Sequence, residues 1–296
     1  MKLIKIVLLI SFFYSCHAQP AVPKLIINKD DNSLLWQVTG NGLQQPSYLF
    51  GTFHLMCKND IHFSGQLTTA VSRADKVYME MDMDDPATLL GGFTLMTMKD
   101  GKTLEQLYSD TDYKKVRQYF ADSLKTSMSF IARMKPFFLE ALLYPKMMPC
   151  KTISGVEEEL MKVAKTQQKE IKGLETMEFQ AAVFDSIPYE EQAKELLKSI
   201  DSMESNKKSF DTMMQVYKNQ QLNEMENLFS KSESGMENHQ DLLLNNRNKN
   251  WVVQLKTIMK ANPVFVAVGA GHLVGNQGLI ELLRKEGYTV QPLMNR

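Results

Sequence analysis

The stretch VFVAVGAGH, residues 264–272, decides the fold of this chain. Its unbroken apolar run is typical of a β-strand, and Gly269 predicts a tight turn that delivers His272 from the strand end. The same form occurs near the other end of the chain, where the apolar run at 48–50 leads into GTFH, residues 51–54. One shared site explains two Gly-x-x-His motifs in matching contexts more simply than two independent accidents.

The segments around these motifs alternate between strand and helix patterns. Strand patterns occur as two runs around a glycine-rich turn within 34–50, and as single runs at 76–82, 170–174, 264–268 and 288–293. Helical patterns occur at 67–74, 155–167 and 276–286. Because a strand-helix-strand ending is typical of α/β proteins, we expect an α/β (α+β) fold. Its central sheet is assembled from N- and C-terminal strands, with helices on its faces.

The middle of the chain reads as helical. Residues 86–148 are rich in Met and Phe, and Pro136 predicts the start or the kink of one helix. The Lys/Glu alternation of residues 177–260 is typical of a solvated helix face. We therefore expect one domain over residues 19–296, with a large helical insertion at about 86–150 and 177–260.

The first eighteen residues have the pattern of a signal peptide. Lys2 and Lys5 form a basic end, residues 6–14 form a short apolar core, and CHA at 16–18 matches a small-x-small cleavage site. This predicts a secreted or periplasmic protein. A lipoprotein acylated at Cys16, and so associated with the cell envelope, is the alternative. With 34 basic and 34 acidic residues, the chain has no basic field to attract nucleic acid.

Two cysteines, Cys57 and Cys150, remain after the predicted cleavage. In an oxidising compartment an isolated pair favours a disulfide over two free thiols. The rival interpretation makes Cys57 a metal ligand, in a His-x-x-Cys arrangement with His54.

Imidazole and carboxylate groups together suit zinc, manganese, cobalt or iron. A catalytic metal site needs about three protein ligands and an open position for water, and His54 and His272 supply two ligands. The carboxylates considered for the third are Glu80, Glu157 and Glu175. These histidines and carboxylates also have plainer interpretations. A His at a strand end is usually a hydrogen-bonded turn residue, and Glu157 stands in a run of three glutamates that ordinarily faces solvent.

Other active-site motifs are absent from the sequence. There is no His-Glu-x-x-His, no Gly-x-Ser-x-Gly and no Walker A loop. Gly269, Gly271 and Gly275 imitate a dinucleotide-binding turn, but no acidic residue follows where a ribose would be held. His62 and His239 belong to no motif and receive no role.

An ordered set of short motifs resembles the TraB/GumN family, which includes the Tiki metalloproteases. The matching pieces are Leu35–Val38 with Gly42, Ser47–His54, Ala74–Asp75 leading to Glu80, Gly155–Glu157, Gly173–Thr176, Arg247–Asn248 with Trp251, and Val268–Gly275. The resemblance implies a core similar to that of erythromycin esterase and the haem-binding ChaN-like proteins. It also implies metal-dependent peptidase activity.

Carried over residue by residue, the essential residues of the family fall on His54, His272 and Glu80, and Glu157 and Arg247 match further positions. Together with the signal-peptide pattern, the resemblance predicts a secreted hydrolase of peptides or proteins with a divalent ion such as Mn, Co or Zn. Glu80 is expected to be a third ligand or the base, and Arg247 to orient a substrate carboxylate or stabilise an oxyanion. The alternative function is a non-catalytic envelope module that binds haem, iron or a peptide.

Overall fold

The computed structural model describes residues 32–85, 92, 95–230 and 239–296. The predicted signal peptide and Cys16 lie outside the described residues, as does part of the predicted insertion. In the described part of the chain, no helix combines the length and the apolar character that crossing a bilayer requires.

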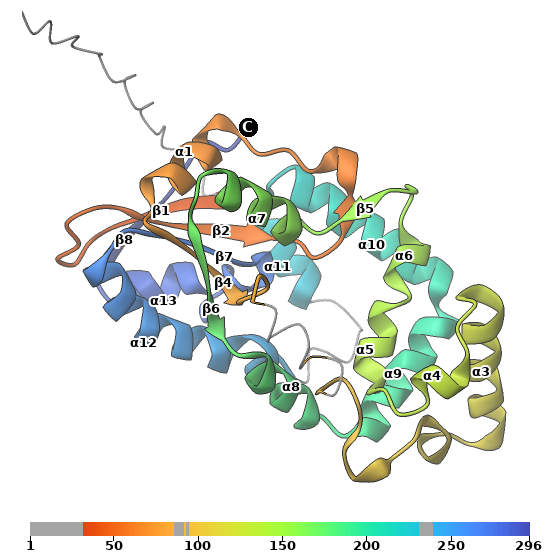
Figure 1. Cartoon of the computed structure of the whole chain (residues 1–296). Helices are drawn as coiled ribbons and strands as arrows, with labels where there is room; N and C mark the ends of the chain where they lie inside the picture. The colour runs from red at the N-terminus through yellow and green to blue at the C-terminus, as the bar shows by residue number, and fades with distance from the viewer. Residues whose placement is uncertain (1–31, 86–91, 93–94, 231–238) are drawn as a thin grey trace, which may run out of the picture.

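A six-stranded mixed sheet, ordered β6-β4-β7-β2-β1-β8, forms the centre of the molecule (Figure 1). Its strands are β1 (Leu35–Gly40), β2 (Ser47–Thr52), β4 (Lys76–Met81), β6 (Glu170–Glu175), β7 (Val264–Gly269) and β8 (Tyr288–Pro292). Strands β6, β4, β7 and β2 are parallel, whereas β1 is antiparallel to both β2 and β8. The expected α/β sheet built from both ends of the chain is therefore confirmed.

Strand β7 lies between β4 and β2 and is covered on both faces. Residues 264–268 are all buried, as the unbroken apolar run requires of an inner parallel strand. In its register with β2, Gly269 lies opposite Thr52, so the two Gly-x-x-His turns leave the sheet side by side. Gly51 permits this approach, because a Cβ there would lie 3.0 Å from the Cβ of Ala270.

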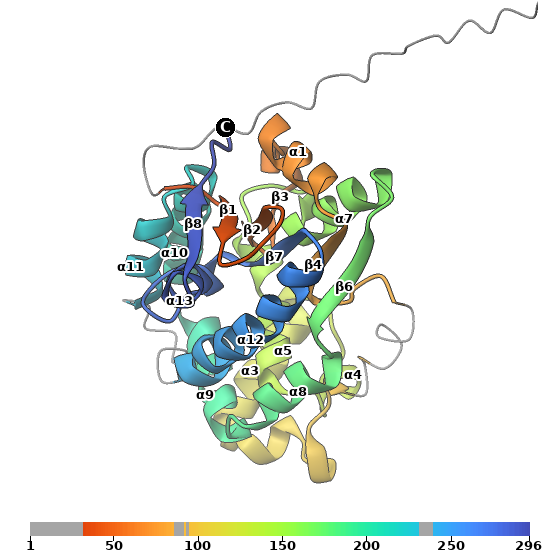
Figure 2. The ribbon, with the colours of Figure 1, turned by 90° about the vertical axis from the view of Figure 1, so that its left-hand side faces the viewer.

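Helices cover both faces of the sheet (Figures 1 and 2). Helices α1 (Gly65–Arg73) and α7 (Val156–Thr166) lie on one face, and α12 (Asn246–Ala261) and α13 (Leu279–Lys285) lie on the other. Each presents an apolar stripe to the sheet, as Trp251 and Leu255 of α12 illustrate, both fully buried in the main core.

A second group of helices lies off the carboxyl ends of the parallel strands (Figure 1). It contains α3 (Asp110–Ser123), α4 (Met128–Ile131), α5 (Pro136–Ala141), α6 (Tyr144–Met147) and α9 (Tyr189–Asp201) around an apolar cluster of their own. Pro136 begins α5, as predicted, because its missing N–H costs nothing in a first turn. The remaining helices are α8 (Met177–Asp185), α10 (Met203–Lys218) and α11 (Leu222–Ser230).

The segment 177–260 is divided between the two cores. Helix α9 packs in the second cluster, whereas α12 packs against the sheet. A small antiparallel sheet of β3 (Met56–Cys57) and β5 (Ile153–Ser154) joins the chain after the first Gly-x-x-His motif to the chain before α7.

Candidate active site

The site lies at the carboxyl ends of the four parallel strands, where open α/β sheets gather their ligands. His54 follows β2, His272 follows β7, Glu80 is the penultimate residue of β4, and Glu175 ends β6. Because β4, β7 and β2 are neighbours, the topology brings together residues from both ends of the sequence.

Two glycines permit the close approaches within the site. The N–H of Gly269 donates to Oε1 of Glu80 over 2.8 Å, and a Cβ at this position would lie 3.3 Å from the same oxygen. A Cβ at Gly155 would lie 2.8 Å from the carbonyl oxygen of His54. Helix α7 can therefore begin directly against the loop that carries His54.

The tautomer of His272 follows from its neighbour Asn248. Nδ2 of Asn248 donates to the carbonyl of Gln277 (2.8 Å), which turns its Oδ1 toward Nδ1 of His272, 2.7 Å away. Since Oδ1 can only accept, the proton of the neutral ring is on Nδ1. Nε2 therefore carries the lone pair, and it lies 3.8 Å from Oε1 of Glu80.

His272 is held in this neutral form. Its side chain is 5% exposed, and burial lowers its pKa to about 4, although the charge of Glu80 works in the opposite direction. The ring also lies against Trp251, with centroids 4.5 Å apart. At neutral pH, His272 is thus an uncharged acceptor at the base of the site.

His54 forms a second, more open arrangement with Glu157 at the start of α7. Its Nδ1 lies 2.8 Å from Oε1 of Glu157, which also accepts from the hydroxyl of Thr52 over 2.6 Å. The hydrogen bond that Nδ1 donates to Glu157 raises the pKa of His54 to about 9, and solvent screens the pair because 79% of the imidazole is exposed. Glu157 does not face solvent as its acidic run suggested, whereas Glu158 and Glu159 pair with Lys162.

Arg247 of α12 joins the carboxylates to His272. Its Nε donates to Glu175. Its NH2 group donates to Oε2 of Glu80 (2.7 Å) and to Oε2 of Glu175 (2.8 Å). Its NH1 group donates to the carbonyl of Leu243 and to Nε2 of His272 (3.2 Å). All five guanidinium N–H groups are therefore in use. Burial favours the neutral form of Glu80. The electrostatic effects of His272 and Arg247 outweigh burial and lower the pKa of Glu80 to about 2.

The structure thus places the sequence-predicted residues in two adjoining networks. One joins His272, Glu80 and Arg247 and the other joins His54 and Glu157, and charges in each shift pKa values in the other. Among the described residues, no three His, Cys, Asp or Glu side chains are grouped closely enough to hold an ion.

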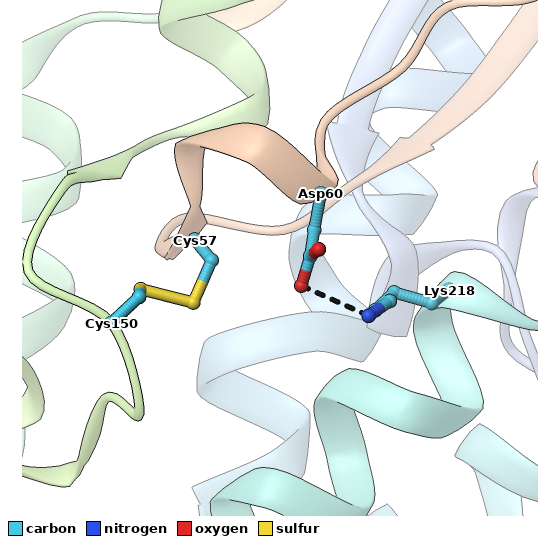
Figure 3. Close-up of a disulfide and its surroundings, with 4 residues drawn as sticks. All are labelled: Cys57, Asp60, Cys150 and Lys218. Atoms are coloured by element: carbon cyan, nitrogen blue, oxygen red, sulfur yellow. Dashed lines mark hydrogen bonds and ion pairs between the residues drawn. A yellow bond between two sulfur atoms is a disulfide. The ribbon is translucent and has the colours of Figure 1, made fainter.

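The cysteines form the predicted disulfide, Cys57–Cys150 (Figure 3). Cys57 is therefore not a thiolate ligand, and the rival interpretation is wrong for this structure. The bond links β3, just after His54, to the segment before Gly155.

Three side chains of the site were missed or misread in the sequence. Asn248 fixes the His272 tautomer, and Thr52 supports Glu157. Glu175 was considered as a metal ligand, yet it anchors Arg247. The sequence signal for each was its place inside a family motif, which says nothing about its hydrogen-bond partner.

The comparisons with known proteins assign the chain to a family. The TraB/PrgY/gumN family matches residues 34–292, which contain both networks. The chain belongs to this family. It is 22% identical to Metalloprotease TIKI2 of Danio rerio, in an alignment that covers 90% of the chain and 62% of that relative. No solved structure shows a significant match.

Proposed function

We propose that the protein is a metal-dependent hydrolase that cleaves peptide bonds in peptides or proteins. The observation that carries this proposal is that an oxygen acceptor contacts Nδ1 in both motif histidines. Nδ1 of His54 is anchored by Glu157 and Nδ1 of His272 by Asn248, so Nε2 is the nitrogen left in each ring to bind an ion, once the ion displaces the proton of His54 and the Arg247 contact of His272. Metal-binding histidines are typically oriented in this way by an oxygen acceptor behind the ring.

The donor types suit a borderline divalent ion such as Mn, Co or Zn. The side chains must move closer together to hold it, since no group of three such donors is preformed among the described residues. His54, His272 and Glu80 would hold the ion, and His272 is already neutral with its lone pair toward Glu80. When bound, such an ion lowers the pKa of a coordinated water to about 7 and polarises a carbonyl group.

The chain's own residues prepare the site around these donors. Glu157 orients His54, and Arg247 keeps Glu80 ionised. The exposed fraction of the side chains falls from 79% at His54 to 17% at Glu80 and 5% at His272. A peptide therefore reaches the site from the side of His54.

Two further observations support this function. The relative TIKI2 is named a metalloprotease, and the disulfide is typical of proteins that act outside the cytosol. We therefore propose that the protein is secreted or periplasmic.

Metal analysis of the mature protein tests the proposal. We expect about one Mn, Co or Zn ion per chain, and its loss in the double variant His54→Ala, His272→Ala. The control variant His62→Ala, His239→Ala removes two histidines outside the site and should keep the ion. Unchanged metal content in the site variant would refute the proposal.

Cleavage profiling supplies the activity test. A diverse peptide library should be cut by the wild-type protein, protected by a chelator and cut again after the metal is restored. Binding of metal without any metal-dependent cleavage would instead favour the non-catalytic alternative.

A further inference from the structure

The contacts of Arg247 conflict with metal binding at the same place. Its NH1 group donates to Nε2 of His272, the atom that the proposed function assigns to the metal. Its NH2 group donates to Glu80, the proposed carboxylate ligand. A nitrogen lone pair that accepts this hydrogen bond cannot at the same time bind an ion, so the two states exclude each other.

We propose that Arg247 occupies the cation position of the metal-free site, and that metal binding releases one N–H of each of its two terminal nitrogens for the substrate. This inference rests on the proposed function. A guanidinium between Glu80, Glu175 and His272 neutralises buried carboxylates that would otherwise repel each other. An incoming divalent ion takes over this neutralisation at Glu80 and repels the guanidinium from it.

Glu175 keeps Arg247 in place during this exchange. It accepts from Nε and from NH2, and it is only 5% exposed, so the pair is buried and geometrically fixed. The carbonyl of Leu243 holds a second NH1 proton, and the guanidinium carbon lies 4.8 Å from the Trp251 ring centroid. None of these contacts involves His272 or Glu80, so Arg247 loses two bonds and remains anchored.

The two bonds that are lost determine what Arg247 gains. One N–H of NH1 and one of NH2 become free on the same edge of the guanidinium, while the anchoring bonds occupy the other N–H groups. Two donors on one planar edge suit a carboxylate or a developing oxyanion. Arg247 is thereby a substrate-positioning residue only in the metal-loaded protein.

Calorimetric titration with Mn²⁺ alone tests the competition. The variant Arg247→Met, Glu175→Gln removes the guanidinium and its buried counter-charge together, which avoids an unpaired carboxylate in the core. We expect it to bind Mn²⁺ at least ten times more tightly than the wild type. The control Arg284→Met removes an arginine that also lies over a tryptophan, Trp36, and should leave the affinity unchanged.

Solvent exchange of the Arg247 guanidinium protons, followed by NMR in the full-length mature protein, tests the release. We expect slow exchange without metal and faster exchange at the terminal nitrogens when Zn²⁺ is added, while Nε–H stays protected by Glu175. This measurement distinguishes release of the two terminal N–H groups of Arg247 from an effect of removing its positive charge.

Each result has a definite meaning. Equal or weaker Mn²⁺ binding by the double variant, or unchanged exchange on adding Zn²⁺ to a protein that binds it, overturns the inference and leaves the metal proposal standing. Absence of binding in both the wild type and the double variant overturns both.

Discussion

At the residue scale, the two motif histidines show how one sequence pattern produces two different acid–base states. His54 is exposed beside a carboxylate, and His272 is buried beside an amide. The first environment raises the histidine pKa to about 9 and the second lowers it to about 4. The motif specifies where each ring is placed, and its neighbours specify the charge.

The hydrogen bond that Nδ1 of His54 donates to the Glu157 carboxylate is the main cause of the high pKa of His54, and the charge of Glu157 adds to it. In the metal-free variant Glu157→Gln we expect this pKa to fall toward the ordinary value of about 6.5, because a neutral amide still accepts from Nδ1 but attracts no proton. NMR titration of the His54 ring measures it. Glu158→Gln, one residue along the same acidic run, is the control and should change little. A His54 pKa that stays near 9 without Glu157 would contradict this account.

Asn248 should matter for metal affinity although it touches no metal. In Asn248→Leu the acceptor for Nδ1 of His272 is lost, and we expect a 10- to 100-fold weaker affinity for Mn²⁺. The variant Asn248→Asp keeps an oxygen acceptor and should retain more of the affinity, although it loses the bond to Gln277. Equal affinities in the two variants would show that Asn248 acts only through packing.

At the element scale, the strands were predictable and several site contacts were not. The run 264–268 is apolar because both faces of β7 are covered, and this is readable in sequence. The bidentate pair of Arg247 and Glu175 joins α12 to the end of β6, and no local pattern reports such a long-range pair. The Lys/Glu alternation of residues 177–260 predicts a solvated helix face and gives no sign that Arg247, which lies within this region, is buried.

The start of α7 is a tight junction between elements of the site. In Gly155→Ala the new Cβ would lie 2.8 Å from the His54 carbonyl oxygen, so α7 or the His54 loop must move. We expect a loss of about 1–3 kcal/mol in the free energy of unfolding, measured by urea denaturation. Gly65→Ala at the start of α1 meets nothing within 4 Å and should be neutral or slightly stabilising. Equal stabilities of the two variants would contradict the close approach.

At the scale of the whole molecule, the site depends on segments that are far apart in sequence. The sheet edge that carries the candidate site combines strands from both ends of the chain with α7 from its middle. Besides the pairing of β3 with β5, two side-chain connections hold the loop after His54 in this assembly, as Figure 3 shows: the disulfide to Cys150 and the ion pair of Asp60 with Lys218 of α10 (2.9 Å). An exposed ion pair contributes little to stability, so the covalent connection dominates.

The disulfide closes a loop across a sequence separation of 93 residues, so its removal should mainly relax the unfolded chain. In the chain-entropy model this costs about 4 kcal/mol, which corresponds to a melting temperature lower by roughly 8–16 °C. We expect this shift in Cys57→Ser, Cys150→Ser, and a reductant should reproduce it in the wild type only. The control Lys218→Met should shift the melting temperature by at most a few degrees.

Two alkylatable thiols in freshly isolated mature protein would refute the bond. The double serine variant keeps all of the proposed metal donors, so it should still bind Mn²⁺. We expect its affinity to be lower than that of the wild type, because the His54 loop is then free to move away from Glu157.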